Sequence, residues 1–173
     1  MVGNSNVLFL TGEYFRAVDT KSRLAIPPKL RESINTAEEG YGFIAVRLYD
    51  NVLYLYTPQT YRKIAPQFET RLEANSDVRS FKRLRYGLAE QLEVDALGRV
   101  LIPENMLKRC GLSKEVAIVG VEDHIEVWAR ARWEAFAEEQ LARHDELAEK
   151  AMALERSSAA GQAAGAPGDV KNV

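Results

Sequence analysis

Cysteine is almost missing from the sequence, and so is an excess of charge of either sign. The 173 residues contain one cysteine, Cys110, which excludes an internal disulfide framework and is typical of proteins in a reducing cytosol. We expect Cys110 to be a small buried apolar residue. The formal net charge is only −2, so any binding of nucleic acid must come from a local basic patch and not from the overall charge.

Long hydrophobic runs are missing as well. The N-terminal run NVLFL at 6–10 is too short for the core of a signal peptide. No other segment approaches the roughly 20 apolar residues that a membrane-spanning helix needs. The chain is 46% hydrophobic and 28% charged, which indicates a soluble unit of one or two small domains. We therefore expect a cytoplasmic protein without a membrane partner.

Motifs for catalysis and metal binding are also missing. The sequence has no P-loop and no nucleophile elbow. Neither of its two histidines, His124 and His144, lies near another plausible ligand at the spacing of a zinc site, and we interpret both as solvated residues. We expect no enzyme activity, no cofactor, no metal and no small-molecule ligand.

What the sequence does contain is an internal repeat. The segment VDTKSRLAIP at 18–27 returns as VDALGRVLIP at 94–103, with Val, Asp, Arg, Ile and Pro identical at a constant spacing. Further on, LYDNVLYLYTPQTY at 48–61 resembles VEDHIEVWARARW at 121–133. The first copy holds a few more residues, which we assign to the loop at 35–42. A match of this length and order indicates a duplicated unit.

Each copy predicts a strand, a turn, a strand that ends at Pro, a short helix or loop, a β-hairpin and a helix. The hairpins are expected around Asp50–Asn51 and Asp123–His124. The helix after the first hairpin is expected over 57–74, with Thr57 as its cap and Pro58 in its first turn.

The repeat also predicts how the chain folds. A β-rich unit of about 45 residues buries too little surface to be stable alone, whereas two such units can share one core, as a symmetric dimer does. We therefore expect an α+β fold, rich in β, formed as an internal pseudo-dimer with flanking helices. The expected division is a first repeat over 12–58, a helical connector over 59–87, a second repeat over 88–131, a C-terminal helix over 132–156 and a disordered Ala/Gly-rich tail over 157–173.

The Asp-x-x-x-Arg segment of each copy has two interpretations. Asp19 and Asp95 can accept hydrogen bonds from nearby backbone amides and pair with the arginine four residues on, which makes them structural. The planar forks of Arg23 and Arg99 suit bidentate contacts to phosphate or to guanine O6 and N7. A carboxylate that orients the guanidinium lowers the entropy cost of such a contact.

The distribution of charge favours the binding interpretation. Both turns lie in basic stretches, 14–34 and 79–99, while the helix expected after residue 130 is acidic. A single charged run is usually only a solvated face. Two basic turns related by a repeat favour a two-lobed surface for a nucleic acid.

In these residues the sequence resembles the MraZ family, bacterial transcriptional regulators built from two SpoVT-AbrB-type domains. The resemblance is carried by the two Asp-x-x-x-Arg segments with Ile-Pro after each, by GLSKEVAIVGVEDHIEVW at 111–128 and by RWEAF at 132–136. It implies a tandem swapped-hairpin β-barrel and a ring-like homo-oligomer. It also implies nucleoid association through double-stranded DNA, bound at short G-rich direct repeats upstream of the division and cell-wall gene cluster.

The resemblance further assigns individual residues. Lys21 and Arg23 of the first turn and Arg99 of the second would contact DNA. Asp19 and Asp95 would organise the two turns.

The sequence departs from the family at two positions. Ser22 stands where the family usually has the glycine that Gly98 provides in the second copy, and a positive φ there costs about 1 kcal/mol. Leu97 takes the position of Lys21, so we expect the two turns to read bases differently. The main alternative to a DNA-binding protein is an oligomeric interaction scaffold, which would use exposed Trp128 and Trp133.

Overall fold

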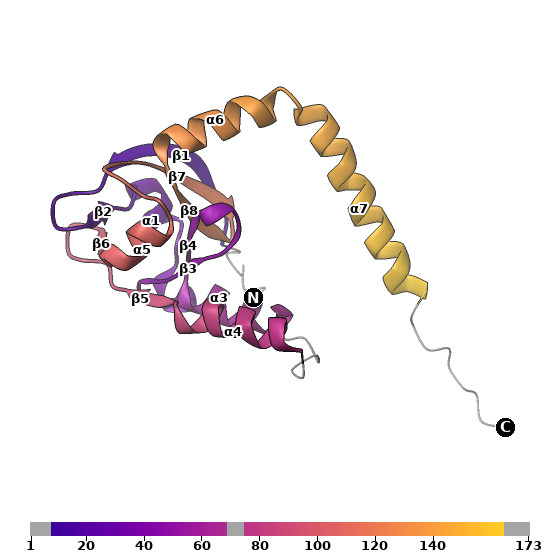
Figure 1. Cartoon of the computed structure of the whole chain (residues 1–173), viewed down its shortest axis with the longest axis horizontal. Helices are drawn as coiled ribbons and strands as arrows, with labels where there is room; N and C mark the ends of the chain where they lie inside the picture. The colour runs from indigo at the N-terminus through magenta and orange to yellow at the C-terminus, as the bar shows by residue number, and fades with distance from the viewer. Residues whose placement is uncertain (1–7, 69–74, 165–173) are drawn as a thin grey trace, which may run out of the picture. The chain divides into compact units, whose positions relative to one another are not determined.

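The computed structural model describes residues 8–68 and 75–164. The strands are β1 (Leu10–Ala17), β2 (Arg23–Ala25), β3 (Phe43–Arg47), β4 (Leu53–Tyr56), β5 (Glu90–Leu92), β6 (Arg99–Leu101), β7 (Glu115–Glu122) and β8 (His124–Ala129) (Figure 1). The helices are α1 (Pro28–Glu32), α2 (Thr36–Glu39), α3 (Pro58–Ile64), α4 (Ser76–Gly87), α5 (Glu104–Arg109), α6 (Arg130–Leu141) and α7 (His144–Ala164), with short 3₁₀ turns η1 (Tyr49–Asn51) and η2 (Ala65–Phe68).

The strands of the two copies interlock. Within the described residues they form an antiparallel sheet of six strands in the order β1-β7-β8-β4-β3-β5 and a two-stranded ribbon of β2 and β6. Strands β1 to β4 belong to the first copy and β5 to β8 to the second. The opening strand of each copy therefore pairs with the hairpin of the other, and the two hairpins meet at β4 and β8. The result is an α+β fold rich in β structure.

The core is common to both copies. Leu24 and Val100 occupy equivalent positions, pair directly across the ribbon and are fully buried. Ile26 and Ile102 are also equivalent positions and are buried in the same cluster, although they lie at opposite ends of the ribbon and do not pair with each other. Each such aliphatic side chain contributes about 1.5–3 kcal/mol when removed from water. Cys110 lies in this cluster with 1% of its surface exposed, which confirms the expected buried apolar cysteine.

The hairpins form near the expected residues. The β3–β4 hairpin turns through Asp50 and Asn51, whose φ angles of 53° and 54° lie in the left-handed region that Asp and Asn tolerate. In the second hairpin Val121 pairs with His124, so its two loop residues are Glu122 and Asp123. The turn therefore lies one residue earlier than the sequence indicates.

The helix after the first hairpin begins as expected and ends earlier. Thr57 caps α3 through a 3.2 Å hydrogen bond that its Oγ1 accepts from a backbone amide, and Pro58 is the first helical residue. The α-helix ends at Ile64 and becomes the turn η2, which contains Pro66. Proline has no N–H to continue the helical hydrogen bonds. The last part of the expected helix, residues 69–74, lies outside the described residues.

The extra residues of the first copy form a helical turn. Asn35 caps α2 by accepting a 3.2 Å hydrogen bond from a backbone amide. The buried carboxylate of Glu39 then accepts hydrogen bonds from the hydroxyls of Thr57 (2.5 Å) and Thr60 (3.0 Å) in α3. The insertion at 35–42 is thus attached to the first hairpin and its helix.

The C-terminal region contains two helices where one was expected over 132–156. Helix α6 ends at Leu141 and α7 begins at His144, and no Gly or Pro marks this break in the sequence. The backbone of α7 continues to Ala164, past Ser157, where the disordered tail was expected to begin. By their contacts the residues fall into two compact units, one ending at Trp133 and one beginning at Glu134.

In 8–68 and 75–164, none of the helices combines the length and the apolar character needed to cross a lipid bilayer.

Candidate nucleic-acid interface

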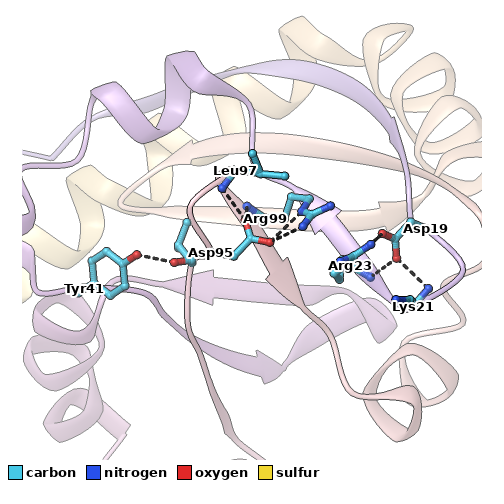
Figure 2. Close-up of polar contacts among 8 residues, drawn as sticks. Asp19, Lys21, Arg23, Tyr41, Asp95, Leu97 and Arg99 are labelled. Carbon is cyan, nitrogen blue, oxygen red and sulfur yellow. Dashed lines mark hydrogen bonds and ion pairs between the residues drawn. The ribbon is translucent and has the colours of Figure 1, made fainter.

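Asp19 organises the turn between β1 and β2. Its Oδ1 accepts hydrogen bonds from the backbone amides of Lys21 (2.8 Å) and Arg23 (2.9 Å). Its Oδ2 accepts from Nε and Nη2 of Arg23, both at 2.7 Å. One carboxylate therefore closes the turn and also orients the guanidinium (Figure 2). These are the contacts on which the structural interpretation of this aspartate depends.

Asp95 organises the turn before β6 with the same set of contacts. Oδ1 accepts from the backbone amides of Leu97 (2.9 Å) and Arg99 (3.0 Å), and Oδ2 accepts from Nε (2.8 Å) and Nη2 (2.7 Å) of Arg99. Figure 2 shows the two turns side by side with matching hydrogen bonds. The repeat in the sequence is therefore a repeat in atomic contacts.

Both aspartates are held in the ionised form. The side-chain and backbone hydrogen bonds from Arg99 lower the pKa of Asp95 to about 2. The backbone hydrogen bond from Arg23 is the largest cause that lowers the pKa of Asp19. Because both pKa values are lowered from the ordinary value for aspartate, both carboxylates are ionised at neutral pH and can pair with the guanidinium groups.

The two turns are also joined to each other. The backbone amide of Ile26 donates to the carbonyl of Gly98 (3.0 Å), and that of Ile102 donates to the carbonyl of Ser22 (2.9 Å). These bonds extend the β2–β6 ribbon at both ends. Each turn is therefore fixed by the strand of the other copy.

The ribbon has one buried face and one outward face. In its antiparallel register Arg23 lies opposite Leu101, and Ala25 lies opposite Arg99. Residues paired across a ribbon share a face, so these four side chains lie on the face opposite the buried Leu24–Val100 pair. The side chains of Arg23 and Arg99 are 33% and 26% exposed. Both arginines are therefore accessible from the same side of the molecule.

A groove of about 490 Å³ follows this outward face. It brings together the three residues to which the family resemblance assigned DNA contact and four others. Its lining is Lys21, Arg23, Glu93, Val94, Asp95, Arg99 and Leu101. The sequence did not single out Glu93 or Leu101. Their role in the groove depends on the pairing of β2 with β6, for which the sequence carries no local signal.

The pairing with aspartate leaves part of each guanidinium available. A guanidinium carries five N–H donors, and the aspartate takes the edge formed by Nε and Nη2. The end formed by Nη1 and Nη2 keeps two donors that point the same way. This is the arrangement required for a bidentate contact to guanine O6 and N7 or to a phosphate.

The two turns differ at the residue before each arginine. Ser22 has φ 58° and Gly98 has φ 75°, so both positions require the left-handed conformation that favours glycine. A Cβ atom on Gly98 would lie 2.4 Å from the guanidinium carbon of Arg31. The end of the Arg31 side chain of α1 therefore covers the second turn. Because that end is flexible and can move aside, glycine is favoured there by its backbone conformation and not by lack of space.

His124 lies in a polar-aromatic cluster on the six-stranded sheet, and the interpretation of this residue as solvated is wrong. Its side chain is 13% exposed, with ring centroids 5.0 Å from those of Tyr54 and Tyr56. Its ring nitrogens lie 2.6 Å from Asp123 Oδ1 and 3.4 Å from Glu126 Oε1. Burial alone lowers the pKa of His124, but the hydrogen bonds to the two carboxylates outweigh burial and raise this pKa.

The tryptophans pack within the protein. Trp128 is buried, and its ring centroid lies 5.5 Å from that of half-buried Trp133. The indole N–H of Trp128 donates to Glu126 (2.8 Å), and that of Trp133 donates to Glu13. These residues therefore do not form the exposed aromatic surface that the scaffold alternative used.

The part of the chain that the structure describes contains no group of three His, Cys, Asp or Glu side chains placed to hold a metal ion. The groove offers the hydrogen-bond donors and positive charges of Lys21, Arg23 and Arg99 beside the apolar side chain of Leu101.

Comparison with known proteins gives a consistent result. Residues 9–84 and 86–156 each match the family described as "MraZ protein, putative antitoxin-like". A protein named Transcriptional regulator MraZ from Acetivibrio thermocellus is 35% identical over 143 residues, which cover 83% of this chain and 96% of that protein. A protein of the same name from Symbiobacterium thermophilum is 36% identical to this chain over 139 residues, which cover 80% of this chain and 97% of that protein. Another protein of this name, from Clostridium tetani, is 34% identical over 143 residues, which cover 83% of this chain and 96% of that protein.

Proposed function

The chain belongs to the MraZ family, and from this we propose that it is a transcriptional regulator that binds double-stranded DNA in a sequence-specific manner. The relatives described above are named as transcriptional regulators, not as enzymes. We assign DNA contact to Lys21, Arg23 and Arg99. Asp19 and Asp95 serve as the residues that position the two arginines.

The observation that supports this proposal most is the outward face of the β2–β6 ribbon. A two-stranded ribbon fits the major groove of B-DNA, which is roughly 12 Å wide. Arg23 and Arg99 lie on the outward face with two guanidinium donors each available. Those donors match the paired acceptors that guanine presents in the major groove. Lys21 adds a charge for the phosphate backbone.

We propose that the interlocked repeats are a swapped-hairpin β-barrel of the SpoVT-AbrB type, with repeats over 12–58 and 88–131 joined by the connector over 59–87. We further propose a ring of subunits, associated with the nucleoid, that binds direct-repeat boxes upstream of the division and cell-wall gene cluster that includes its own gene. One subunit offers two or three base contacts of about 1–3 kcal/mol each, so several subunits must bind together for specific recognition.

The test is footprinting and gel-shift titration on the DNA upstream of the protein's own gene, with the wild type and Arg23→Ala. We expect protected, regularly spaced boxes for the wild type. The variant should lose specific binding, because it lacks the donors for guanine, and should keep the wild-type mass in light scattering. Lys63→Ala, which removes an exposed cation of α3, is the control and should bind normally. Wild-type affinity in Arg23→Ala would show that the assigned site is wrong.

A further inference from the structure

Leu101 is an exposed apolar residue of the charged groove. Its side chain is 59% exposed, lies directly opposite Arg23 in the ribbon and shares the outward face with Arg99. The groove that it lines otherwise carries charged side chains, apart from Val94. A scattered exposed leucine needs no explanation. This one is the register partner of Arg23 and lies two residues from Arg99 on the same face of the ribbon.

The equivalent residue of the first copy is different. Ala25 occupies the matching position in β2, is also exposed and lies opposite Arg99. The buried positions between them, Leu24 and Val100, are both branched aliphatic residues of similar size. The two copies are thus alike on the buried face of the ribbon and unlike on its outward face. Packing of the core does not account for the leucine.

The major groove of DNA contains one apolar group that such a side chain can contact. It is the C5-methyl group of thymine, next to the O4 acceptor. The guanidinium end of Arg23 would donate hydrogen bonds to a guanine in the major groove. Leu101 lies next to Arg23 across the ribbon, so its side chain would contact a neighbouring base in the same groove. Cytosine, adenine and guanine present no methyl group at this edge, so an apolar side chain there discriminates between bases.

Resting on the proposed DNA-binding function, we propose that Leu101 is a specificity-determining residue that contacts a thymine methyl group beside the guanine addressed by Arg23. Ala25 is too short to make the same contact beside Arg99. The proposal adds an apolar base contact to the polar contacts assigned above. It also gives each subunit a direction along the DNA, because its two halves select different bases.

The test is a double-mutant cycle between the protein side chain and the DNA methyl group. Each thymine of the footprinted box is replaced in turn, in all boxes together, by deoxyuridine, which lacks only the methyl group. For the wild type we expect one position at which the replacement weakens binding at least about fourfold, the factor that corresponds to one buried methyl group. For Leu101→Ala we expect the same replacement to have no effect.

Leu84→Ala is the matched control, because Leu84 of α4 is exposed to a similar extent, 63%, and lies outside the groove. This variant should show the full effect of the missing methyl group. The inference on Leu101 is overturned, and the proposed function stands, if the wild type binds its boxes but no thymine is sensitive, or if Leu101→Ala keeps the sensitivity. A changed oligomer mass in Leu101→Ala would also overturn it, in favour of a protein interface. If the wild type binds no upstream DNA, the proposed function itself is wrong.

Discussion

Ser22 adopts a backbone conformation that glycine adopts without strain. Its φ of 58° is required because its carbonyl accepts the hydrogen bond from Ile102, and its amide donates 3.0 Å to the carbonyl of Asp19. The left-handed conformation costs an L-residue about 1–2 kcal/mol. The local contacts of Asp19 and the pairing of the ribbon together impose this conformation on the serine.

Ser22→Gly should therefore stabilise the protein. The relief of strain is partly offset by the greater entropy of glycine in the unfolded chain, which leaves a gain of about 0.5–1 kcal/mol in the free energy of unfolding and a rise in Tm of about 2–3 °C. Thermal and urea denaturation measure both quantities. Ser22→Ala keeps the strain and serves as the control. The reverse change, Gly98→Ser, should lower Tm, because the φ of 75° at this position is strained for a residue with a side chain. A lower Tm for Ser22→Gly would contradict the interpretation.

Strands β4 and β8 join the hairpins of the two copies, and His124 lies at the end of their pairing. It is the register partner of Tyr56, and Glu126 is the partner of Tyr54. The imidazole is stacked on Tyr54, tilted against Tyr56 and held by the carboxylates of Asp123 and Glu126. This strand pair therefore contains a titratable group at the junction of the repeats.

The stability of this junction should depend on pH. The pKa of His124 is raised in the folded protein, so its protonated form contributes stability that is complete below about pH 6.5, the unfolded value, and is lost as the pH rises through the folded pKa. The Tm difference between the wild type and His124→Gln should therefore be larger at pH 6 than at pH 9. His144→Gln, at an exposed histidine of α7, is the control. A difference that stays constant with pH would refute this role of His124.

At the scale of the whole molecule, the two copies are alike in strand pairing and in turn contacts but differ in the side chains of the proposed DNA-binding face. The sheet order and the Asp-x-x-x-Arg contacts are repeated in both copies. The outward side chains differ, with Lys21 against Leu97 and Ala25 against Leu101. A symmetric surface would select inverted-repeat boxes. An asymmetric one gives each subunit a polarity, which suits direct repeats bound by neighbouring subunits of the proposed ring.

Operator binding should therefore depend on the number and the direction of the boxes. We expect the affinity to fall on the order of a hundredfold when several boxes are reduced to one, because linked binding is lost. Reversing a single box within the array should weaken binding about as much as deleting that box. Gel-shift titration on fragments of equal length measures both effects. Equal affinity for one box and for several would rule out cooperation between subunits.

The local chemistry of the turns was open to prediction from the sequence. Asp19 and Arg23, and likewise Asp95 and Arg99, are four residues apart, so their contacts form within one turn and depend little on the rest of the fold. The same is true of the cap at Thr57. The break between α6 and α7 and the burial of His124 escaped prediction. The break carries no local sequence signal, and His124 is buried by tyrosines of another strand.

By itself the sequence determined that this protein has two equivalent halves, each with an aspartate-closed turn that orients an arginine, because these features depend on residues adjacent along the chain. The tertiary structure alone decided that β1 pairs with β7 and β5 with β3, and that the two arginines share a face with Leu101. The physical reason is that β2 and β6 acquire a common outward face only when distant segments pair in one register. Hydrophobic burial of Leu24 against Val100 fixes that register.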